Sequence, residues 1–251
     1  MSSTAAFLAS LASILIGAAF GMVLKRALPA DLLEGGSKEA IRLGAGFLST
    51  LAALVIGLMI ASAKNTYDSQ NTNIRQLGTN AVLVDQMLTQ YGPEAKAART
   101  LLREIIPSAT LRIWRESIET SGGSAFVIGG NAERFYNAVE GLKPVNAEQT
   151  SLKSRIIEIT TEMGRIRLLV FTQSDNAIPV PFFVVLTFWL VVIFASFSLF
   201  AEPNKIVVSS ILVFALSVSS ALFLIVDLGQ PFSGLMQISN HHLHAVLPKI
   251  E

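Results

Sequence analysis

The sequence predicts an all-α integral membrane protein with four transmembrane helices and a helical, partly coiled-coil insert between the second and the third. Of its 251 residues, 51% are hydrophobic and only 15% are charged, whereas soluble domains carry about 25% charged residues. The charges are also unevenly placed, because residues 64–177 hold 25 of them. This distribution excludes an ordinary soluble enzyme and a disordered or fibrous chain. It predicts a membrane part joined to one polar segment.

Four stretches are apolar and long enough to cross a bilayer, which takes about 20 residues of helix. Charged residues flank each stretch, at the level where the membrane interface is expected. The first stretch has no basic residue ahead of it and is longer than the apolar core of a signal peptide, so we interpret it as a span. The four spans are residues 5–24, 43–63, 178–200 and 206–226.

The spans pair into two hairpins, which place the polar segment and both termini on one side of the membrane. The short loops 25–42 and 201–205 carry five basic residues. Because short loops rich in Lys and Arg stay in the cytoplasm, we expect a multi-pass protein of the cell inner membrane with its helical domain and termini outside the cytoplasm. The expected parts are a first hairpin (1–63), a helical polar domain (64–177), a second hairpin (178–226) and an interfacial turn and tail (227–251).

Apolar residues in the polar segment recur every three or four positions, which is the period of an α-helix. One stripe ends at the stop signal Gly92-Pro93, and another follows the start signals Asn146 and Glu148. Such stripes pack either within the chain or between copies. Between them we expect shorter helices over 94–106, 111–118 and 132–139 and a strand-like segment at 125–128, with almost no sheet. The stripes are Ile74, Leu77, Ala81, Val84, Leu88 and Tyr91, and Leu152, Ile156, Ile159, Met163, Ile166 and Val170.

Small residues follow one face of the second span, and Gly17 and Gly21 repeat the pattern in the first. Such faces allow the backbones of membrane helices to approach closely. The stripe of the second span is therefore a candidate either for helix packing or for the lining of a narrow pore. Its members are Ser49, Ala53, Gly57, Ala61 and Asn65.

The fourth span carries Ser210, Ser217 and Ser220, which project from one face together with Asp227. Serine gains little from facing lipid, so we expect this stripe to face a hydrated permeation path or to hydrogen-bond a neighbouring helix. No Asp, Glu, Lys or Arg lies well inside a span. This argues against ion-coupled transport, which usually uses such a residue, and leaves a passive pathway open.

Prolines mark both ends of the second hairpin. Pro179 and Pro181 open the third span, where we expect a rigid elbow or a gating hinge. After the fourth span, Gly and Pro end the helix and predict a tight turn at the membrane mouth, with Phe232, Leu235, Met236 and Ile238 in the interface. The pore-mouth candidates are Asp68, Asp227, Gln230, Pro231 and Phe232.

The common catalytic patterns are absent from the sequence. It contains no cysteine and no nucleophile elbow, phosphate loop, zinc-protease helix or dinucleotide fingerprint, so we predict neither an enzyme nor a cofactor. His241, His242 and His244 lack an adjoining carboxylate, and we expect a solvated tail there rather than a metal site. A net charge of +1 argues against a nucleic-acid partner.

Three segments together resemble a bacterial four-span family called bestrophin-like. They are residues 61–68, the helix from Thr150 that carries Arg165 and Arg167 ahead of Ile178-Pro179, and residues 227–234 with Ile238-Ser239. The resemblance covers roughly residues 43–240, and Pro231-Phe232-Ser233-Gly234 is its most specific piece. The chain departs from the family pattern at Gly229-Gln230, ahead of the Pro-Phe pair, and at Phe182-Phe183, after the two prolines.

Kinship to the bestrophins, which are pentameric anion channels, implies an oligomeric ion channel. No acidic cluster of a calcium clasp is visible in the sequence, so calcium gating is not implied. Our hypothesis is a homo-oligomer in the lipid bilayer that conducts inorganic ions passively, with the second and fourth spans lining the pore. The alternative is a non-conducting membrane sensor or scaffold whose helical domain binds a partner.

Overall fold

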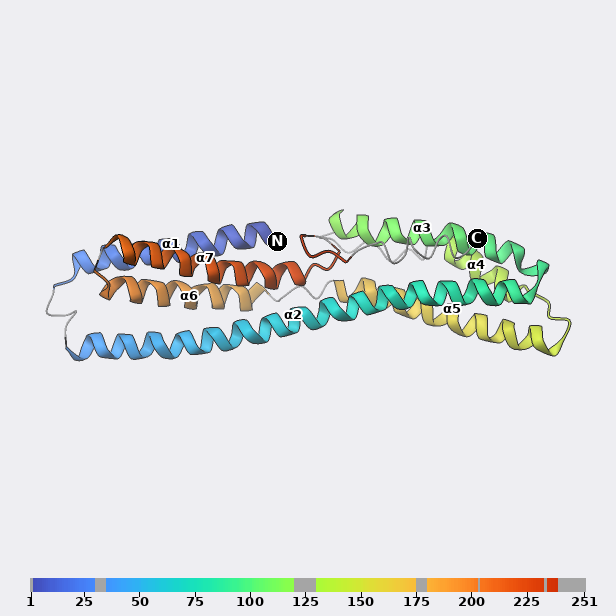
Figure 1. The fold of residues 1–251 in the computed structure, drawn as a ribbon, viewed down its shortest axis with the longest axis horizontal. Coiled ribbons are helices and arrows are strands. Elements are labelled where there is room, and N and C mark those ends of the chain that lie inside the picture. Colours follow the sequence, from blue (N-terminus) through green and yellow to red (C-terminus); the bar gives the residue numbers. More distant parts are fainter. Residues whose placement is uncertain are drawn as a thin grey trace. The chain divides into compact units, whose positions relative to one another are not determined.

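The computed structural model describes residues 2–29, 35–119, 130–174, 180–202, 204–232 and 234–238, and every regular element within these ranges is helical (Figure 1). The predicted all-α class is therefore confirmed. The elements are α1 (Ser3–Ala27), α2 (Gly36–Tyr91), a short 3-10 turn η2 (Pro93–Ala95), α3 (Lys96–Glu119), α4 (Gly130–Glu140), α5 (Ala147–Ser174), α6 (Val180–Phe200) and α7 (Lys205–Leu228).

Helices α1, α6, α7 and the first part of α2 are long and apolar enough to cross a membrane. These are the four predicted spans. Side-chain caps define two of their starts: the Ser2 hydroxyl accepts a hydrogen bond from the Ala5 amide at 3.3 Å, and the Asn204 carboxamide accepts one from the Ile206 amide at 2.8 Å.

Helix α2 runs without a break for 56 residues, so the second span and the first apolar stripe of the insert belong to one helix. It ends at Tyr91, and the next residue is Gly92, whose φ of 118° is a conformation that favours glycine; Pro93 follows. Helix α5 begins where Asn146 accepts a hydrogen bond from the Gln149 amide at 2.7 Å. Residues 175–179, with the hinge candidate Pro179, lie outside the described residues.

The insert differs from the prediction between residues 94 and 118. The two helices expected at 94–106 and 111–118 are one helix, α3, with Pro107 inside it. A proline withholds one N–H from the helix and displaces one carbonyl, yet the surrounding residues keep the helical conformation on both sides. The helix predicted at 132–139 is α4, and the strand-like segment predicted at 125–128 lies outside the described residues.

The chain divides into two compact units. The membrane unit comprises Met1–Thr66 and Asn176–Gly229, and the helical unit comprises Tyr67–Asp175 and Gln230–Glu251. In the membrane unit, α1, α6 and α7 lie side by side and the first part of α2 packs against them (Figure 1). Its core includes Ile14, Ala18, Ala52, Leu186, Leu190, Ala215, Leu222 and Ile225.

The helical unit buries both predicted apolar stripes within the chain. Leu88 and Ile156 belong to a core that also takes in η2, α3 and α4, while Ile74, Ile166 and Val170 form a second cluster with Phe232 and Ile238. The most buried members of the stripes are thus already covered by the protein's own helices. Pairing within the chain is the alternative that the structure supports for these stripes.

Candidate functional site

Helices α1 and α6 approach one another through the glycines of the first span. A Cβ atom added at Gly17 would lie 2.9 Å from the Val191 carbonyl oxygen, and one added at Gly21 would lie 2.9 Å from the Ala195 carbonyl carbon. Such distances leave no room for a side chain. The small pair in α1 is therefore a packing face between two helices that run parallel.

The small stripe of α2 differs from this pair, because most of it is exposed in the part of the chain that the structure describes. Ala53, Gly57, Ala61 and Asn65 are exposed, and a Cβ atom added at Gly57 would meet no atom within 4 Å. Ser49 is half-buried, and its hydroxyl donates to the Ala45 carbonyl oxygen at 2.7 Å. In the most apolar 18-residue stretch of α2, only 17% of the residues are buried, whereas 28–33% are buried in the corresponding stretches of the other three spans. The second span is therefore the one least covered by the rest of the chain.

Gly46 and Thr50 are also exposed and extend this surface towards the start of α2. We call the extended surface the α2 small face. At about 100° per residue, its members fall within an arc of roughly 80°. The spacing of four, three and four residues from position 46 to position 57 is the sequence signal that locates Gly46 and Thr50. The α2 small face comprises Gly46, Thr50, Ala53, Gly57 and Ala61, all exposed.

Beside the α2 small face lies a second exposed surface made of large apolar side chains. Its members project within an adjacent arc of roughly 60°. An apolar surface of this kind suits lipid or a neighbouring membrane helix. Its members and their exposed fractions are Leu43 (69%), Phe47 (68%), Leu54 (61%) and Leu58 (63%).

The predicted serine stripe of α7 also points away from the core of the membrane unit. Ser217 and Ser220 are exposed, and their hydroxyls donate at 2.8 Å to the carbonyl oxygens of Val213 and Leu216 in the same helix. Ser210 is half-buried. The fully buried serine of α7 is Ser219, whose hydroxyl has no hydrogen-bond partner among the described residues.

Asp227, a pore-mouth candidate, is completely buried in the last turn of α7. Helices α1 and α7 run in opposite directions (Figure 1), and the rings of Phe7 and Phe223 meet edge to face at 6.4 Å. Asp227 therefore belongs to the packed interior of the membrane unit.

The remaining pore-mouth candidates belong to the helical unit. Asp68 is exposed on α2, Gln230 is half-buried, and Pro231 and Phe232 are buried. A hydrogen bond of 2.7 Å from the Ile238 amide to the Pro231 carbonyl oxygen closes the turn that follows α7. In this turn, Gly234 has a φ of 98°, which favours glycine.

Phe232 and Ile238, which we expected in the membrane interface, are buried against α2 and α5. Their burial follows from the turn, which directs both side chains onto the cluster around Ile74. Leu235 (83% exposed) and Met236 (44%) stay on the surface.

A bidentate ion pair joins α2 to α3 in the helical unit. The Arg99 Nε and Nη2 atoms donate to the two oxygens of Asp85 at 2.8 and 2.9 Å. Asp85 is only 4% exposed. The hydrogen bond to Asp85 raises the pKa of Arg99, against the opposing effect of burial, so the guanidinium stays charged.

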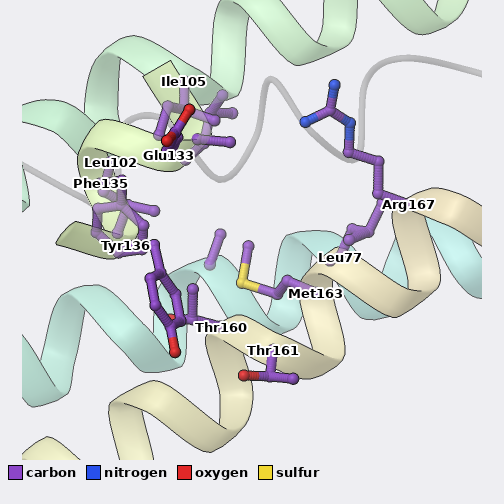
Figure 2. A pocket seen from close by; sticks show the side chains of 14 residues that line it. Leu77, Leu102, Ile105, Glu133, Phe135, Tyr136, Thr160, Thr161, Met163 and Arg167 are labelled. Atoms are coloured by element: carbon purple, nitrogen blue, oxygen red, sulfur yellow. The ribbon is translucent and has the colours of Figure 1, made fainter. Parts of the chain in front are cut away.

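A pocket of about 640 Å³ opens between α2, α3, α4 and α5 of the helical unit (Figure 2). Leu77, Leu102, Phe135 and Met163 contribute apolar wall, and Arg167 extends from α5 beside it. This lining suits an apolar group rather than an ion. The pocket therefore offers a mainly apolar binding place, with Glu133, Tyr136 and Arg167 also in its lining.

The remaining candidates from the sequence are the hinge residue Pro181 and the three histidines of the tail. Pro181 lies in the first turn of α6 and is exposed. His241, His242 and His244 lie outside the described residues. Within the described ranges, no group of three or more His, Cys, Asp or Glu residues is placed to hold a metal ion.

We compared the sequence and the fold with those of known proteins. No curated protein matches the chain. Two solved structures of a bacterial bestrophin homolog from Klebsiella pneumoniae are similar in fold. An isoleucine-to-threonine variant has a TM-score of 0.70 and 10% identity, covering 95% of this chain and 96% of that one. A leucine-to-threonine variant has a TM-score of 0.71 and 11% identity, covering 96% and 97%.

The model of the bestrophin-like domain matches residues 11–243, which include most of the first span, all of the other three spans and the described part of the helical unit. The four apolar helices and the all-α fold agree with that match. The chain belongs to the bestrophin-like family of membrane proteins.

Proposed function

We propose that the protein assembles into a homo-oligomer whose subunits surround a passive ion-conducting pore, with the α2 small face towards the pore. The observation that carries this proposal is the open space around Gly57, where an added Cβ atom would meet nothing within 4 Å. A small-residue face in a membrane helix is used where something approaches the backbone closely. Among the described residues of one subunit, no atom lies within 4 Å of a Cβ at Gly57, so we infer that the approaching group is a neighbouring subunit or a permeating ion.

The chemistry of the α2 small face suits passive conduction. The face carries no charge between Arg42 and Lys64, and the Thr50 hydroxyl donates to the Gly46 carbonyl oxygen at 3.1 Å. A narrow path lined by hydroxyl, backbone and methyl groups passes ions without a coupled proton. The basic residues at the two ends of the stretch add positive potential at the entrances, which attracts anions.

Residues on α7 take a secondary part in this proposal. The exposed Ser217 and Ser220 would flank the lining helix or meet a neighbouring subunit. Their hydroxyls already donate within α7, so they need no outside partner. Asp227 is buried, and the proposal assigns it to the packing of α7 rather than to the pore mouth.

We further propose that the protein lies in the cell inner membrane with its hairpin loops in the cytoplasm. Lys25, Arg26, Lys38, Arg42 and Lys205 all lie in or beside the two short loops. The helical unit and the termini are then outside the cytoplasm. Protease accessibility in right-side-out vesicles tests this orientation, since cleavage confined to the helical unit supports it and protection of that unit contradicts it.

The test of function is electrical recording from purified protein in planar bilayers, with the oligomer mass measured on the same preparation. Reproducible unitary currents from an intact oligomer are expected. Repeated silence from intact oligomers would contradict conduction.

A second candidate function is a non-conducting sensor or scaffold, which the pocket of about 640 Å³ in the helical unit favours. In that case the unit would bind a partner or an apolar ligand and the membrane part would serve as an anchor. Silent bilayers, together with a bound molecule recovered from the purified protein, would favour this candidate.

A further inference from the structure

A second pocket lies in the membrane unit, at the end where α2 begins and α6 finishes. Its volume is about 280 Å³. Lys38 and Arg42 of α2 line one side, and Ser196, Phe197 and Phe200 of α6 line the other. Lys38 and Arg42 precede the α2 small face, so neither lines the proposed conduction path, although Arg42 also adds positive charge at one entrance of it.

Two cationic side chains share this pocket. Lys38 and Arg42 are one turn apart on α2, both are exposed, and no ion pair involves either of them in the part of the chain that the structure describes. Like charges four residues apart on a helix repel one another. An anion held between them would remove that repulsion.

A third cation acts on the pocket from α1. The Lys25 Nζ atom donates to the carbonyl oxygen of Ala201, a lining residue, at 2.8 Å. The end of a helix carries partial negative charge on its free carbonyl groups, which repels anions. By neutralising the end of α6, Lys25 leaves the positive charge of Lys38 and Arg42 dominant.

The depth of the pocket and its apolar wall indicate what kind of anion fits. Arg42 directly precedes the apolar stretch of α2, and Phe200 is the last residue of α6, so the pocket lies at the level of the lipid headgroups. Phe197 is 52% exposed beside the cations. Charge and exposed apolar surface therefore occur together, as on an amphipathic ligand.

We propose that this pocket binds the phosphate headgroup of an anionic phospholipid. Arg42 and Lys38 contact the phosphate oxygens, and the two phenylalanines contact the glycerol and the first part of the acyl chains. A guanidinium group matches the geometry of phosphate oxygens with paired donors. Basic pockets between membrane helices are a known means of recognising acidic lipids. The proposal does not depend on conduction.

The test uses the full-length protein in detergent, with phosphatidylglycerol, phosphatidylcholine and glycerol 3-phosphate as probes. Native mass spectrometry measures the retained lipid, and the thermal unfolding midpoint measures stabilisation. Phosphatidylglycerol is expected to be retained and to raise the midpoint, and the K38Q/R42Q variant is expected to retain it roughly tenfold more weakly. The R42K variant should keep part of the effect.

The matched control is the R26Q/K205Q variant, which removes two exposed positive charges near the same end of the unit but outside the pocket. It is expected to retain phosphatidylglycerol like the unmodified protein. Equal loss in both double variants would overturn the proposal, because general surface charge would then explain binding. Equal retention of phosphatidylcholine would also overturn it, and so would an equal midpoint shift with glycerol 3-phosphate.

Discussion

Gly21 of α1 lies against the backbone of Ala195 in α6, so closely that a Cβ atom at position 21 would come within 2.9 Å of the Ala195 carbonyl carbon. The same two helices meet at Gly17 and Val191 one turn earlier. Since Lys25 then donates to the Ala201 carbonyl oxygen, the contact continues from mid-helix to the end of α6. These contacts fix α1 against α6 within the membrane unit.

Adding a methyl group at this contact should loosen the membrane unit. We expect Gly21→Ala to lower the free energy of unfolding by about 1–3 kcal/mol, because the helices must separate to admit it. The measurement is helix content against increasing SDS mole fraction in mixed micelles. The control is Gly57→Ala, which fills open space and should be neutral or stabilising by up to about 1 kcal/mol. Equal losses at both positions would contradict the packing described for Gly21.

The ion pair between Asp85 and Arg99 should matter to the helical unit. We expect Asp85→Asn to cost about 1–3 kcal/mol, since it removes the charge-assisted bidentate hydrogen bonds that join the buried Asp85 to the partly exposed Arg99. Chemical unfolding of the full chain measures this loss. Glu162→Gln is the control, because its pair with Arg165 is 3.5 Å long and exposed and should contribute less than about 1 kcal/mol. A loss no larger than that of the control would show that the Asp85 pair is not needed.

Tyr91 should make the helical unit sensitive to alkali. Burial raises the pKa of the Tyr91 phenol above its ordinary value of 10.0, and the negative charge of Glu94 raises it further. The folded state then holds the proton more tightly than the unfolded state does, so the contribution of Tyr91 to stability is complete below pH 10 and is lost as the pH rises through the folded-state pKa.

The variant Tyr91→Phe should therefore weaken the decline of stability above pH 10. At neutral pH it should not destabilise, because the Tyr91 hydroxyl is buried without a hydrogen-bond partner among the described residues. Unfolding midpoints between neutral and alkaline pH measure both effects. Tyr136→Phe, at a 38% exposed position, is the control and should leave the slope unchanged. Identical slopes for Tyr91→Phe and the unmodified protein would contradict this account.

The sequence predicts where the helices lie along the chain better than it predicts which of them pack together. The four spans and the stripes around Leu88 and Ile156 are local patterns of apolar residues, and periodicity locates them directly. Pro107 misleads because a proline often ends a helix, whereas here α3 continues on both sides of it. Phe232 misleads because its burial depends on a turn that brings it back to Ile74, far away in the sequence.

The candidate site shows the same limit more clearly. The pattern of Gly17 and Gly21 in α1 resembles that of Ala53 and Gly57 in α2, and both fit packing or a pore equally well as sequence. Only the position of the neighbouring helices separates them: Val191 and Ala195 cover the first pair, whereas no described residue comes within 4 Å of a Cβ at Gly57. Composition also conceals the second pocket, because Lys38 and Arg42 read as ordinary flanking charges until α6 is placed beside them.

The central claim is that the α2 small face surrounds an ion pathway in an oligomer, and unitary conductance in planar bilayers tests it most directly. The comparison is between the unmodified protein, Gly57→Leu and the matched control Gly44→Leu, which is equally exposed and open but projects roughly 140° away from Gly57. We predict that Gly57→Leu sharply lowers or abolishes the unitary conductance of intact oligomers while Gly44→Leu leaves it unchanged. A Gly57→Leu oligomer that conducts like the unmodified protein would contradict the claim.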